Sequence, residues 1–398
     1  MFVNCIDKIF NDFEAIRSDI EISIDKMKHE LGEFIDHIVL YGAGSAGIAF
    51  LKYLNDVDIH PVCFADGKQE KWGTMCEGLN IISPETITEV VGKKALVIVT
   101  INTDGKRYCK SFEEALRIDG HCGVHKMLHE YGCDNVIDYT YFRRCHSLFH
   151  GDNYNLPSCS DINMMLKNRE CISSVYDLLE DDLSKETYEK IVKFRLIDDS
   201  ITIPTLTQEN QYFEPDMYSV HNNACFVDCG AFNGISLKTF LKINGGFKKY
   251  YGIEPDRYNY ELLNDFVNSL SENIRDKCDI YNVAAYDNCS EELIYSLKGP
   301  GSFMSDKGNE LVRTRTIDDI LDSSEATYIK MNIEGSERKA LCGAENTIKF
   351  FKPMLAIAGY HKTWDLWEIP ILIKKFRADY KIRLRSYMNH LSFVYYCE

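Results

Sequence analysis

The sequence predicts an α/β protein with two open sheets, because it contains two glycine-rich turns that each lie between an apolar strand and a helix. Residues 37–41 lead into the first turn, and residues 224–227 lead into the second. Around both turns, short apolar runs alternate with helical patterns, which is typical of parallel strands joined by helices. A length of 398 residues is enough for two to three domains.

The pattern along the chain predicts four segments. Residues 1–36 place apolar side chains at helical spacing, so we expect an amphipathic helical leader. Residues 37–141 have the alternating pattern of a Rossmann-like nucleotide-binding domain. Residues 142–204 begin with turn-forming residues and continue as a mainly helical connector or cap. A second alternating segment, 205–398, predicts a C-terminal doubly wound domain.

The charge balance excludes several classes of protein. Lys and Arg number 45 against 61 Asp and Glu, which gives a net charge of −16 and disfavours a nucleic-acid partner. The N-terminus lacks the pattern of a signal peptide, and the apolar runs are too short to span a membrane. Fifteen cysteines without an export signal are typical of free thiols in a reducing compartment. We therefore expect a cytoplasmic protein without a membrane or nucleic-acid partner.

The first glycine-rich turn has the pattern G-x-G-x-x-G. Gly42, Gly44, Ser45 and Gly47 follow the strand and open a helix, where backbone N–H groups can hold a pyrophosphate. Asp66 ends the next apolar run, at the spacing expected for a ribose-binding acid. The pattern predicts a nucleotide site. The alternative is a turn that needs small residues only for packing.

Residues beyond this turn carry a family resemblance. The segments 64–67, 71–73 and 81–85 resemble the small nucleotide-binding domains of sugar-modifying acyltransferases and methyltransferases. The resemblance covers about 65 residues. It implies a nucleotide or nucleotide-sugar ligand in this domain.

The second turn, residues 228–234, follows the apolar strand 224–227 and precedes a helix. About 25 residues further on, Glu254 lies at the tip of the next strand. A carboxylate there can accept hydrogen bonds from two ribose hydroxyls, so the spacing alone predicts a nucleoside site.

From the second turn onward the sequence resembles the FkbM-type methyltransferases over about residues 205–398. Seven landmarks carry the resemblance: 211–213, 227–231, 253–255, 282–285, 316–319, 329–335 and 360–367. The resemblance implies a seven-stranded class I fold, S-adenosylmethionine as cofactor, and O-methylation of a sugar, glycan or nucleotide-linked sugar. It also implies cofactor-binding residues, with Glu254 on the ribose and the others along the ligand: Asp228, Gly230, Ala231, Asn233, Gly234, Ala284 and Ala285.

Four polar residues are the candidates for catalysis. Lys330, Asn332 and Glu334 alternate at the end of the predicted fourth strand, so we expect all three on one side, with Glu334 as general base or as the residue that orients the acceptor. His361 follows the fifth strand, 354–358, and an ordinary histidine pKa would suit proton abstraction. The alternative is that these side chains only cap strand ends.

Asn332 departs from the family pattern, which usually has Asp at this position. If the family's Asp holds a divalent ion or polarises the acceptor, we expect this protein to be metal-independent, slow or inactive. The alternative function is a catalytically silent nucleotide- or S-adenosylmethionine-binding protein. An NAD-dependent oxidoreductase is disfavoured, because residues 37–141 contain no identifiable acid or base for hydride transfer.

One further cluster consists of histidine and cysteine residues, which are common metal ligands. His121, His125, His129 and Cys133 recur every four residues and would share one helix face. Gly123 and Gly132 argue for a short helix, so we favour a partly exposed polar face and expect no metal site.

Overall fold

The computed structural model of the chain divides it into two compact units. The first unit is Met1–Arg169 with Glu189–Thr205, and the second is Glu170–Tyr188 with Leu206–Glu398. The division falls within two helices of the predicted connector, α9 (Arg169–Leu178) and α10 (Asp182–Ile197). The structure describes residues 5–20, 22–101, 111–117, 123–144, 162–197, 209–217, 223–296, 303–304, 310–387 and 392–398.

The first unit is built on a six-stranded sheet of order β3-β4-β2-β1-β5-β6. Its pairings are parallel except for the antiparallel β3–β4 pair. Because β1 lies between β2 and β5, the strand order reverses beside the first glycine-rich turn, as in open α/β sheets that bind ligands there. The strands are β1 (Ile38–Tyr41), β2 (Cys63–Ala65), β3 (Met75–Cys76), β4 (Leu79–Ile82), β5 (Leu96–Val99) and β6 (Asn135–Asp138).

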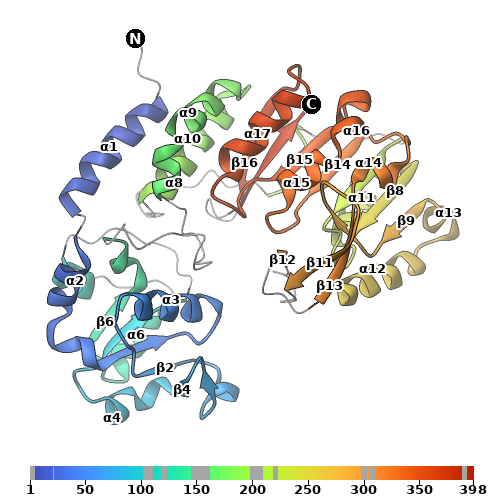
Figure 1. Cartoon of the computed structure of the whole chain (residues 1–398). Helices are drawn as coiled ribbons and strands as arrows, with labels where there is room; N and C mark the ends of the chain where they lie inside the picture. Colours follow the sequence, from blue (N-terminus) through green and yellow to red (C-terminus); the bar gives the residue numbers. More distant parts are fainter. Residues whose placement is uncertain are drawn as a thin grey trace. The chain divides into compact units, whose positions relative to one another are not determined.

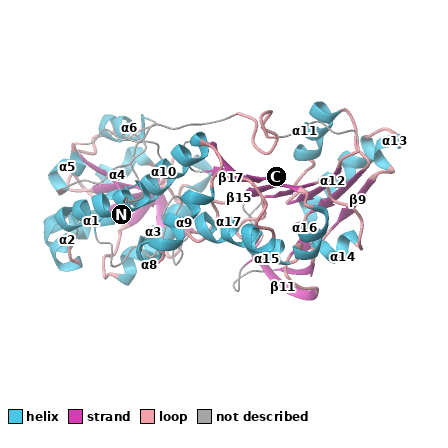
Figure 2. Cartoon of the chain, turned by 90° about the horizontal axis from the view of Figure 1, so that it is seen from above, coloured by secondary structure: helices cyan, strands magenta, loops and turns pink. Residues whose placement is uncertain are grey.

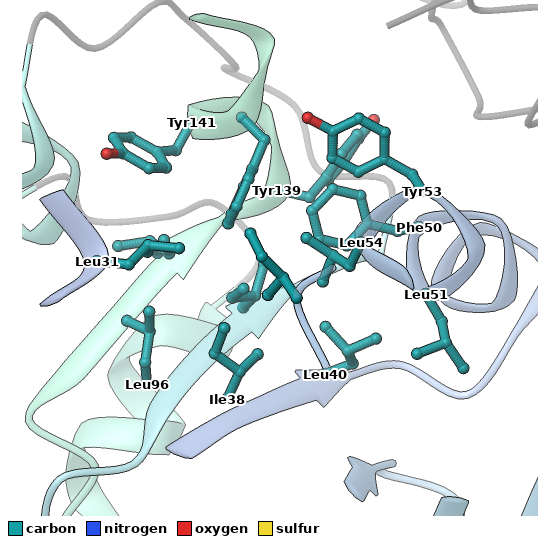
Figure 3. Packing of buried hydrophobic residues seen from close by; sticks show 14 of the residues in the cluster. Leu31, Ile38, Leu40, Phe50, Leu51, Tyr53, Leu54, Leu96, Tyr139 and Tyr141 are labelled. Atoms are coloured by element: carbon teal, nitrogen blue, oxygen red, sulfur yellow. The ribbon is translucent and has the colours of Figure 1, made fainter. Parts of the chain in front are cut away.

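Helices of the first unit supply much of its core. Figure 1 shows α3 and α6 beside the sheet, and Figure 3 shows Ile38, Leu40 and Leu96 of the strands facing aromatic side chains. Phe50 of α3 contacts Tyr53 and Tyr139, with ring centroids 5.5 and 5.7 Å apart. The helices are α1 (Cys5–Ile20), α2 (Ile24–Leu31), α3 (Ser45–Asp56), α4 (Ile87–Val90), α5 (Phe112–Leu116), α6 (Val124–Glu130) and α8 (Ile162–Lys167), with 3-10 turns η1 (Gly32–His37), η2 (Gln69–Lys71), η3 (Pro84–Thr86) and η5 (Tyr139–Arg144).

The second unit is built on a seven-stranded sheet of order β16-β17-β15-β14-β7-β8-β9. Strands β9, β8, β7, β14 and β15 are parallel, whereas β17 pairs antiparallel with both β15 and β16. The predicted α/β class and the seven-stranded C-terminal sheet are confirmed. The strands are β7 (Cys225–Cys229), β8 (Lys249–Ile253), β9 (Cys278–Tyr281), β14 (Tyr328–Met331), β15 (Met354–Ala358), β16 (Ile382–Tyr387) and β17 (Ser392–Cys397).

A smaller four-stranded sheet, of order β10-β13-β11-β12, accompanies the large one. Figure 2 shows helices flanking the strands of the second unit. The small sheet consists of β10 (Ala284–Ala285), β11 (Ser290–Ser296), β12 (Phe303–Met304) and β13 (Glu310–Arg315). The helices are α11 (Ile235–Asn244), α12 (Arg257–Ser269), α13 (Glu272–Arg275), α14 (Ile317–Leu321), α15 (Glu337–Cys342), α16 (Glu345–Phe351) and α17 (Asp365–Phe376).

Stacked aromatic rings fix the central strands of the second unit. Phe226 of β7 stacks on Phe240 of α11 at 4.7 Å and on Tyr328 of β14 at 5.2 Å between ring centroids. All three side chains are fully or almost fully buried. This packing holds the first residues of β7 and β14 beside one another, and the parallel register then places Met331 opposite Cys229 at the carboxyl ends. Among the described residues, no helix combines the length and apolar character needed to cross a membrane.

Candidate functional site

A cavity of about 420 Å³ lies in the second unit, where the residues that follow β7, β8 and β14 meet. This is the edge at which open α/β sheets bind ligands. Seven predicted site residues line it, namely Gly230, Glu254, Ala284, Ala285, Lys330, Asn332 and Glu334. Five others do not, namely Asp228, Ala231, Asn233, Gly234 and His361.

Gly230 lines the cavity at a position where only glycine fits. Its φ is +78°, and a Cβ at this position would lie 2.0 Å from the carbonyl oxygen of Asn332. The N–H groups of Gly230 and Ala231 both donate to the carbonyl of Ile253, at 2.9 and 3.1 Å. These two hydrogen bonds fix the turn to the end of β8, beside the cavity that Gly230 lines.

Glu254 lies at the tip of β8 and is 5% exposed. Its Oε2 accepts a hydrogen bond from the N–H of Phe232 at 2.8 Å, and its Oε1 accepts one from Asp256 at 3.0 Å. Burial raises the pKa of Glu254 to about 7, and the two N–H donors oppose this shift. The carboxylate faces the cavity with lone pairs still able to accept from ribose hydroxyls.

Asp228 and Lys330 form a buried ion pair beneath the turn. Lys330 Nζ donates to Asp228 Oδ1 and to the carbonyl of Gly230, both at 2.8 Å. The second oxygen of Asp228 accepts from the hydroxyl of Tyr250 at 3.1 Å. Both charges are more than nine-tenths buried, so each needs the other to offset the loss of water. The structure places Asp228 as a support for the turn.

Asn332 and Glu334 reach the cavity for a different reason than expected. The sequence analysis expected strand alternation through Glu334, but β14 ends at Met331. The following residues form a turn in which Glu334 has a φ of +55° and Gly335 a φ of +95°. Both side chains therefore reach the cavity through a left-handed turn rather than through the period of a strand. Burial raises the pKa of Glu334, and His361 opposes this shift.

Glu337 is a site residue that the sequence analysis missed. It begins α15 and is fully buried, and its two carboxylate oxygens accept N–H groups of Ile333 at 2.8 Å and Gly335 at 2.9 Å. The only signal in the sequence is an acidic residue just before a helical run, which usually indicates an ordinary helix start.

His361 has a different chemistry from the one expected. Its Nδ1 lies 2.8 Å from Glu337 Oε1, and its Nε2 lies 3.7 Å from Glu334 Oε1. The Nδ1–H group of His361 is not aligned for a straight hydrogen bond to Glu337, so charge attraction dominates the contact between these two residues. Burial lowers the pKa of His361, but Glu337 and Glu334 outweigh it and raise the pKa to about 9. This pKa lies above the ordinary value expected for His361 and favours the imidazolium at neutral pH, which argues against a role as proton acceptor.

Other lining residues come from the 209–217 segment and the first turns of α11. Tyr212 has a φ of +73°, its N–H donates to the hydroxyl of Tyr396 at 2.8 Å, and its carbonyl accepts from Tyr328. In the sequence, this segment carried only a landmark of the family resemblance. The missed residues are Gln211, Tyr212, Phe213, Phe232, Ile235, Ser236, Thr239, Ile253, Pro255, Asn259, Ile333 and Ser336.

In the first unit, the glycine-rich turn has the predicted strand and helix around it. A Cβ at Gly47 would lie 1.9 Å from the carbonyl oxygen of Gly42, so close packing of α3 requires a glycine. Asp66 Oδ2 accepts from the N–H of Ala43 at 2.9 Å and from Lys71 at 2.8 Å, and its Oδ1 accepts from Lys68. Asp66 thus braces the turn itself. Gly44 is the N-cap of α3 and Ser45 is its first residue, and ligand binding there stays a prediction.

The histidine cluster does not form the expected helix face. His121 lies outside the described residues, and α6 ends at Glu130, before Cys133. His125 is buried rather than partly exposed, and His129 Nδ1 lies 2.7 Å from the carbonyl of Cys133.

Among the described residues, a different set of three side chains offers metal-ligand atoms close together. These atoms, from Glu337, His361 and Asp365, lie within 4.8 Å of one another. The carboxylate of Glu337 already accepts two N–H groups and lies against a protonated His361, so an ion pair explains this cluster.

The sheet and the cavity define the second unit as an open α/β domain with a cavity at the carboxyl edge of its central strands. Residues 228–395 match the family model described as the Methyltransferase FkbM domain. The resemblance expected from the sequence is confirmed over these residues by this match to the family model.

Solved structures extend the comparison. Methyltransferase FkbM from Methylobacillus flagellatus KT aligns with 98% of this chain and 98% of its own, with a TM-score of 0.70 and 21% identity. It shares the fold over both units. An rRNA methylase from Streptococcus thermophilus matches 45% of this chain and 88% of its own, with a TM-score of 0.30 and 16% identity. A Streptococcus mutans protein in complex with SAH matches 45% of this chain and 90% of its own, with a TM-score of 0.29 and 13% identity. Among curated proteins, none matches the chain.

Proposed function

We propose that the second unit transfers a methyl group from S-adenosylmethionine to a hydroxyl oxygen of a sugar, glycan or nucleotide-linked sugar. The observation that carries this proposal is the cavity between Gly230, Glu254 and Glu334, in a domain that matches a methyltransferase family. The oxygen as acceptor atom and the sugar as substrate come from the family resemblance of the chain.

The lining residues fit the cofactor. Gly230 allows the turn to pack closely against the carbonyl of Asn332 at the cavity, and Glu254 offers a buried carboxylate to ribose hydroxyls. Ala284 and Ala285 are small and buried, which leaves space for an adenine ring. When bound, the cofactor supplies a methyl group on a sulfonium, which is already activated for transfer.

The chain has two tasks left: to align an acceptor oxygen and to take its proton. Glu334 lines the cavity and is the candidate base, since a raised pKa brings a carboxylate closer to the working pH. Asn332 keeps one acceptor oxygen and adds an N–H₂ donor, so it can orient the acceptor without taking a proton. Lys330 is engaged beneath the turn and supports its shape.

Calorimetric titration of the purified chain with S-adenosylmethionine and S-adenosylhomocysteine tests the proposal. We expect about one equivalent to bind, and binding to be lost in Glu254→Ala. Asp228→Ala should also abolish it, because Lys330 would be left buried without a counter-charge. A screen of sugar and nucleotide-sugar acceptors then follows. A wild-type chain that binds neither compound would overturn the proposal.

A silent binding protein remains the alternative function, and Asn332 favours it. The Asn332→Asp variant separates the two possibilities in the acceptor screen. A methylated product from the wild-type chain supports the enzyme. Cofactor binding without product in the wild type, but with product in Asn332→Asp, supports a decayed site.

A further inference from the structure

The 332–336 turn carries four lining residues of the cavity, and the side chain of Glu337 supports it from the opposite side. Glu337 accepts the N–H groups of Ile333 and Gly335 on its two oxygens, on either side of Glu334. Glu334 and Gly335 both have a positive φ, a conformation that is costly for Glu334 and needs outside support. The two hydrogen bonds to Glu337 provide that support.

The carboxylate of Glu337 is fully buried and is balanced by one cation. His361 lies 2.8 Å from Glu337 and 3.7 Å from Glu334, and its own side chain is 9% exposed. Asp365, from α17, also faces His361, and its carboxylate accepts the N–H of Lys362 at 2.8 Å. The ring of Tyr360 packs against the imidazole at 4.3 Å between centroids. His361 therefore lies among three carboxylates. It bridges Glu337, which supports the turn, to Glu334, which belongs to the turn.

We propose that Glu337 and His361 form a positioning pair that holds Asn332 and Glu334 at the cavity. This inference rests on the proposed methyl transfer, for which Glu334 is the candidate base. Glu337 fixes the backbone of the turn, and the imidazolium of His361 neutralises Glu337 and anchors the side chain of Glu334. Neither residue lines the cavity, so both act through the turn.

The pair also predicts a pH limit. His361 gains its proton through its carboxylate partners, so its pKa in the folded chain lies above its ordinary value. The stabilisation is fully present below the ordinary histidine pKa and is lost as the pH rises through about 9. Above that pH, the 332–336 turn should loosen and cofactor binding should weaken.

Hydrogen exchange tests the hydrogen bonds of Glu337 directly. In Glu337→Gln, one amide oxygen remains as acceptor, whereas the NH₂ group opposes the second N–H. We expect backbone exchange in a peptide covering 332–336 to become about tenfold faster or more, measured by mass spectrometry. Glu345→Gln is the matched control, because Glu345 begins α16 but pairs with Lys349 at the surface. Equal exchange in wild type, Glu337→Gln and Glu345→Gln would overturn the proposal.

NMR titration of the histidine signals tests the second partner, with His361→Gln used to assign the signal. In the wild type, His361 should titrate near pH 9, and in Glu337→Gln its pKa should fall toward the ordinary value. If circular dichroism shows that Glu337→Gln does not fold, hydrogen exchange of the 332–336 peptide is measured in His361→Gln instead. The positioning pair predicts faster exchange in this variant than in the wild type. A wild-type His361 with an ordinary pKa would contradict the pair.

S-adenosylhomocysteine binding separates this inference from the proposed function. Exchange and titration are measured without ligand, so they report on the pair even if no cofactor binds. A chain with a protected turn and no ligand binding refutes the methyltransferase proposal alone. A chain that binds ligand while its turn is indifferent to Glu337→Gln and His361→Gln refutes the positioning pair alone.

Discussion

At the scale of single residues, the most informative group is Glu254. Its carboxyl group is buried at the tip of β8, and burial raises its pKa to about 7. Below that pH it carries a proton and can no longer accept two ribose hydrogen bonds. We expect the affinity for S-adenosylhomocysteine to rise about tenfold between pH 6 and pH 8, measured by calorimetry.

The Glu254→Gln variant is the control for this pH dependence. Its amide does not titrate, so its affinity should be lower and flat between pH 6 and pH 8. A wild-type affinity that is equally flat would show that Glu254 is not the titrating group.

Gly230 is the residue at which a single methyl group should be most harmful. The Cβ of an alanine would collide with the carbonyl of Asn332, and the φ of +78° disfavours any side chain. We expect Gly230→Ala to lower the free energy of unfolding by about 3 kcal/mol and to abolish S-adenosylhomocysteine binding. Urea unfolding and calorimetry measure the two effects.

Gly246→Ala is the matched control, because no heavy atom lies within 4 Å of the added Cβ and its φ is not in the left-handed region. The free energy of unfolding of this variant should change by no more than about 0.5 kcal/mol. Equal losses in the two variants would contradict the steric argument.

At the residue scale, the sequence pointed to residues of the cavity where its signal was local. Glu254 was predicted from its spacing after an apolar strand and Gly230 from the family resemblance, and both line the cavity. Glu337 was missed because its role depends on where β14 ends. The pKa of His361 depends on carboxylates at positions 334, 337 and 365, which only the folded chain brings to the ring.

At the scale of elements, the 209–217 segment is held to the sheet by tyrosine hydroxyls. Tyr396 of β17 accepts the N–H of Tyr212, and it shares a hydrogen bond of 2.7 Å with Tyr387. Tyr387 donates to the buried Glu214 at 2.8 Å. Because Tyr212 lines the cavity, the last two strands of the sheet help to shape the ligand site.

The Tyr396→Phe variant tests this connection. It leaves the N–H of Tyr212 buried without an acceptor, which should cost about 1–3 kcal/mol of unfolding free energy. It should also weaken S-adenosylhomocysteine binding, because the lining segment is released. Tyr380→Phe loses one buried hydrogen bond, to the carbonyl of Pro353, whereas Tyr396→Phe loses two, and Tyr380 lies outside the cavity lining. It should lose stability and keep its affinity, so equal affinities in the two variants would contradict the role of Tyr396.

Element-scale prediction was strongest for apolar strands. The run 354–358 was predicted as a strand and forms β15 with the same bounds. The expected alternation beyond Met331 failed because Glu337 and the positive φ of two residues impose a turn there. Periodicity in the sequence does not record such backbone conformations.

At the scale of the whole molecule, the alternating pattern of strands and helices occurs twice in the sequence because the chain forms two compact units. Each unit has its own sheet with its own order, and each glycine-rich turn follows the central strand at which that order reverses. Local sequence therefore predicted both sheets. It placed the helices after residue 142 in one connector, whereas the structure divides α9 and α10 between the units. Which helix packs on which core depends on contacts distant in sequence.

The net charge of −16 leads to a prediction about acceptors. A fold alone does not choose a substrate, and a polyanion needs a basic surface to offset phosphate repulsion. We expect no saturable complex with single- or double-stranded RNA at about 150 mM salt, where even non-specific binders show dissociation constants of about 10⁻⁴–10⁻⁶ M. Fluorescence anisotropy measures this, with S-adenosylhomocysteine present so that the cofactor cavity can be filled. A saturable complex that weakens steeply with salt would reveal a basic surface hidden by the net charge, and would redirect the acceptor screen from sugars to nucleic acid.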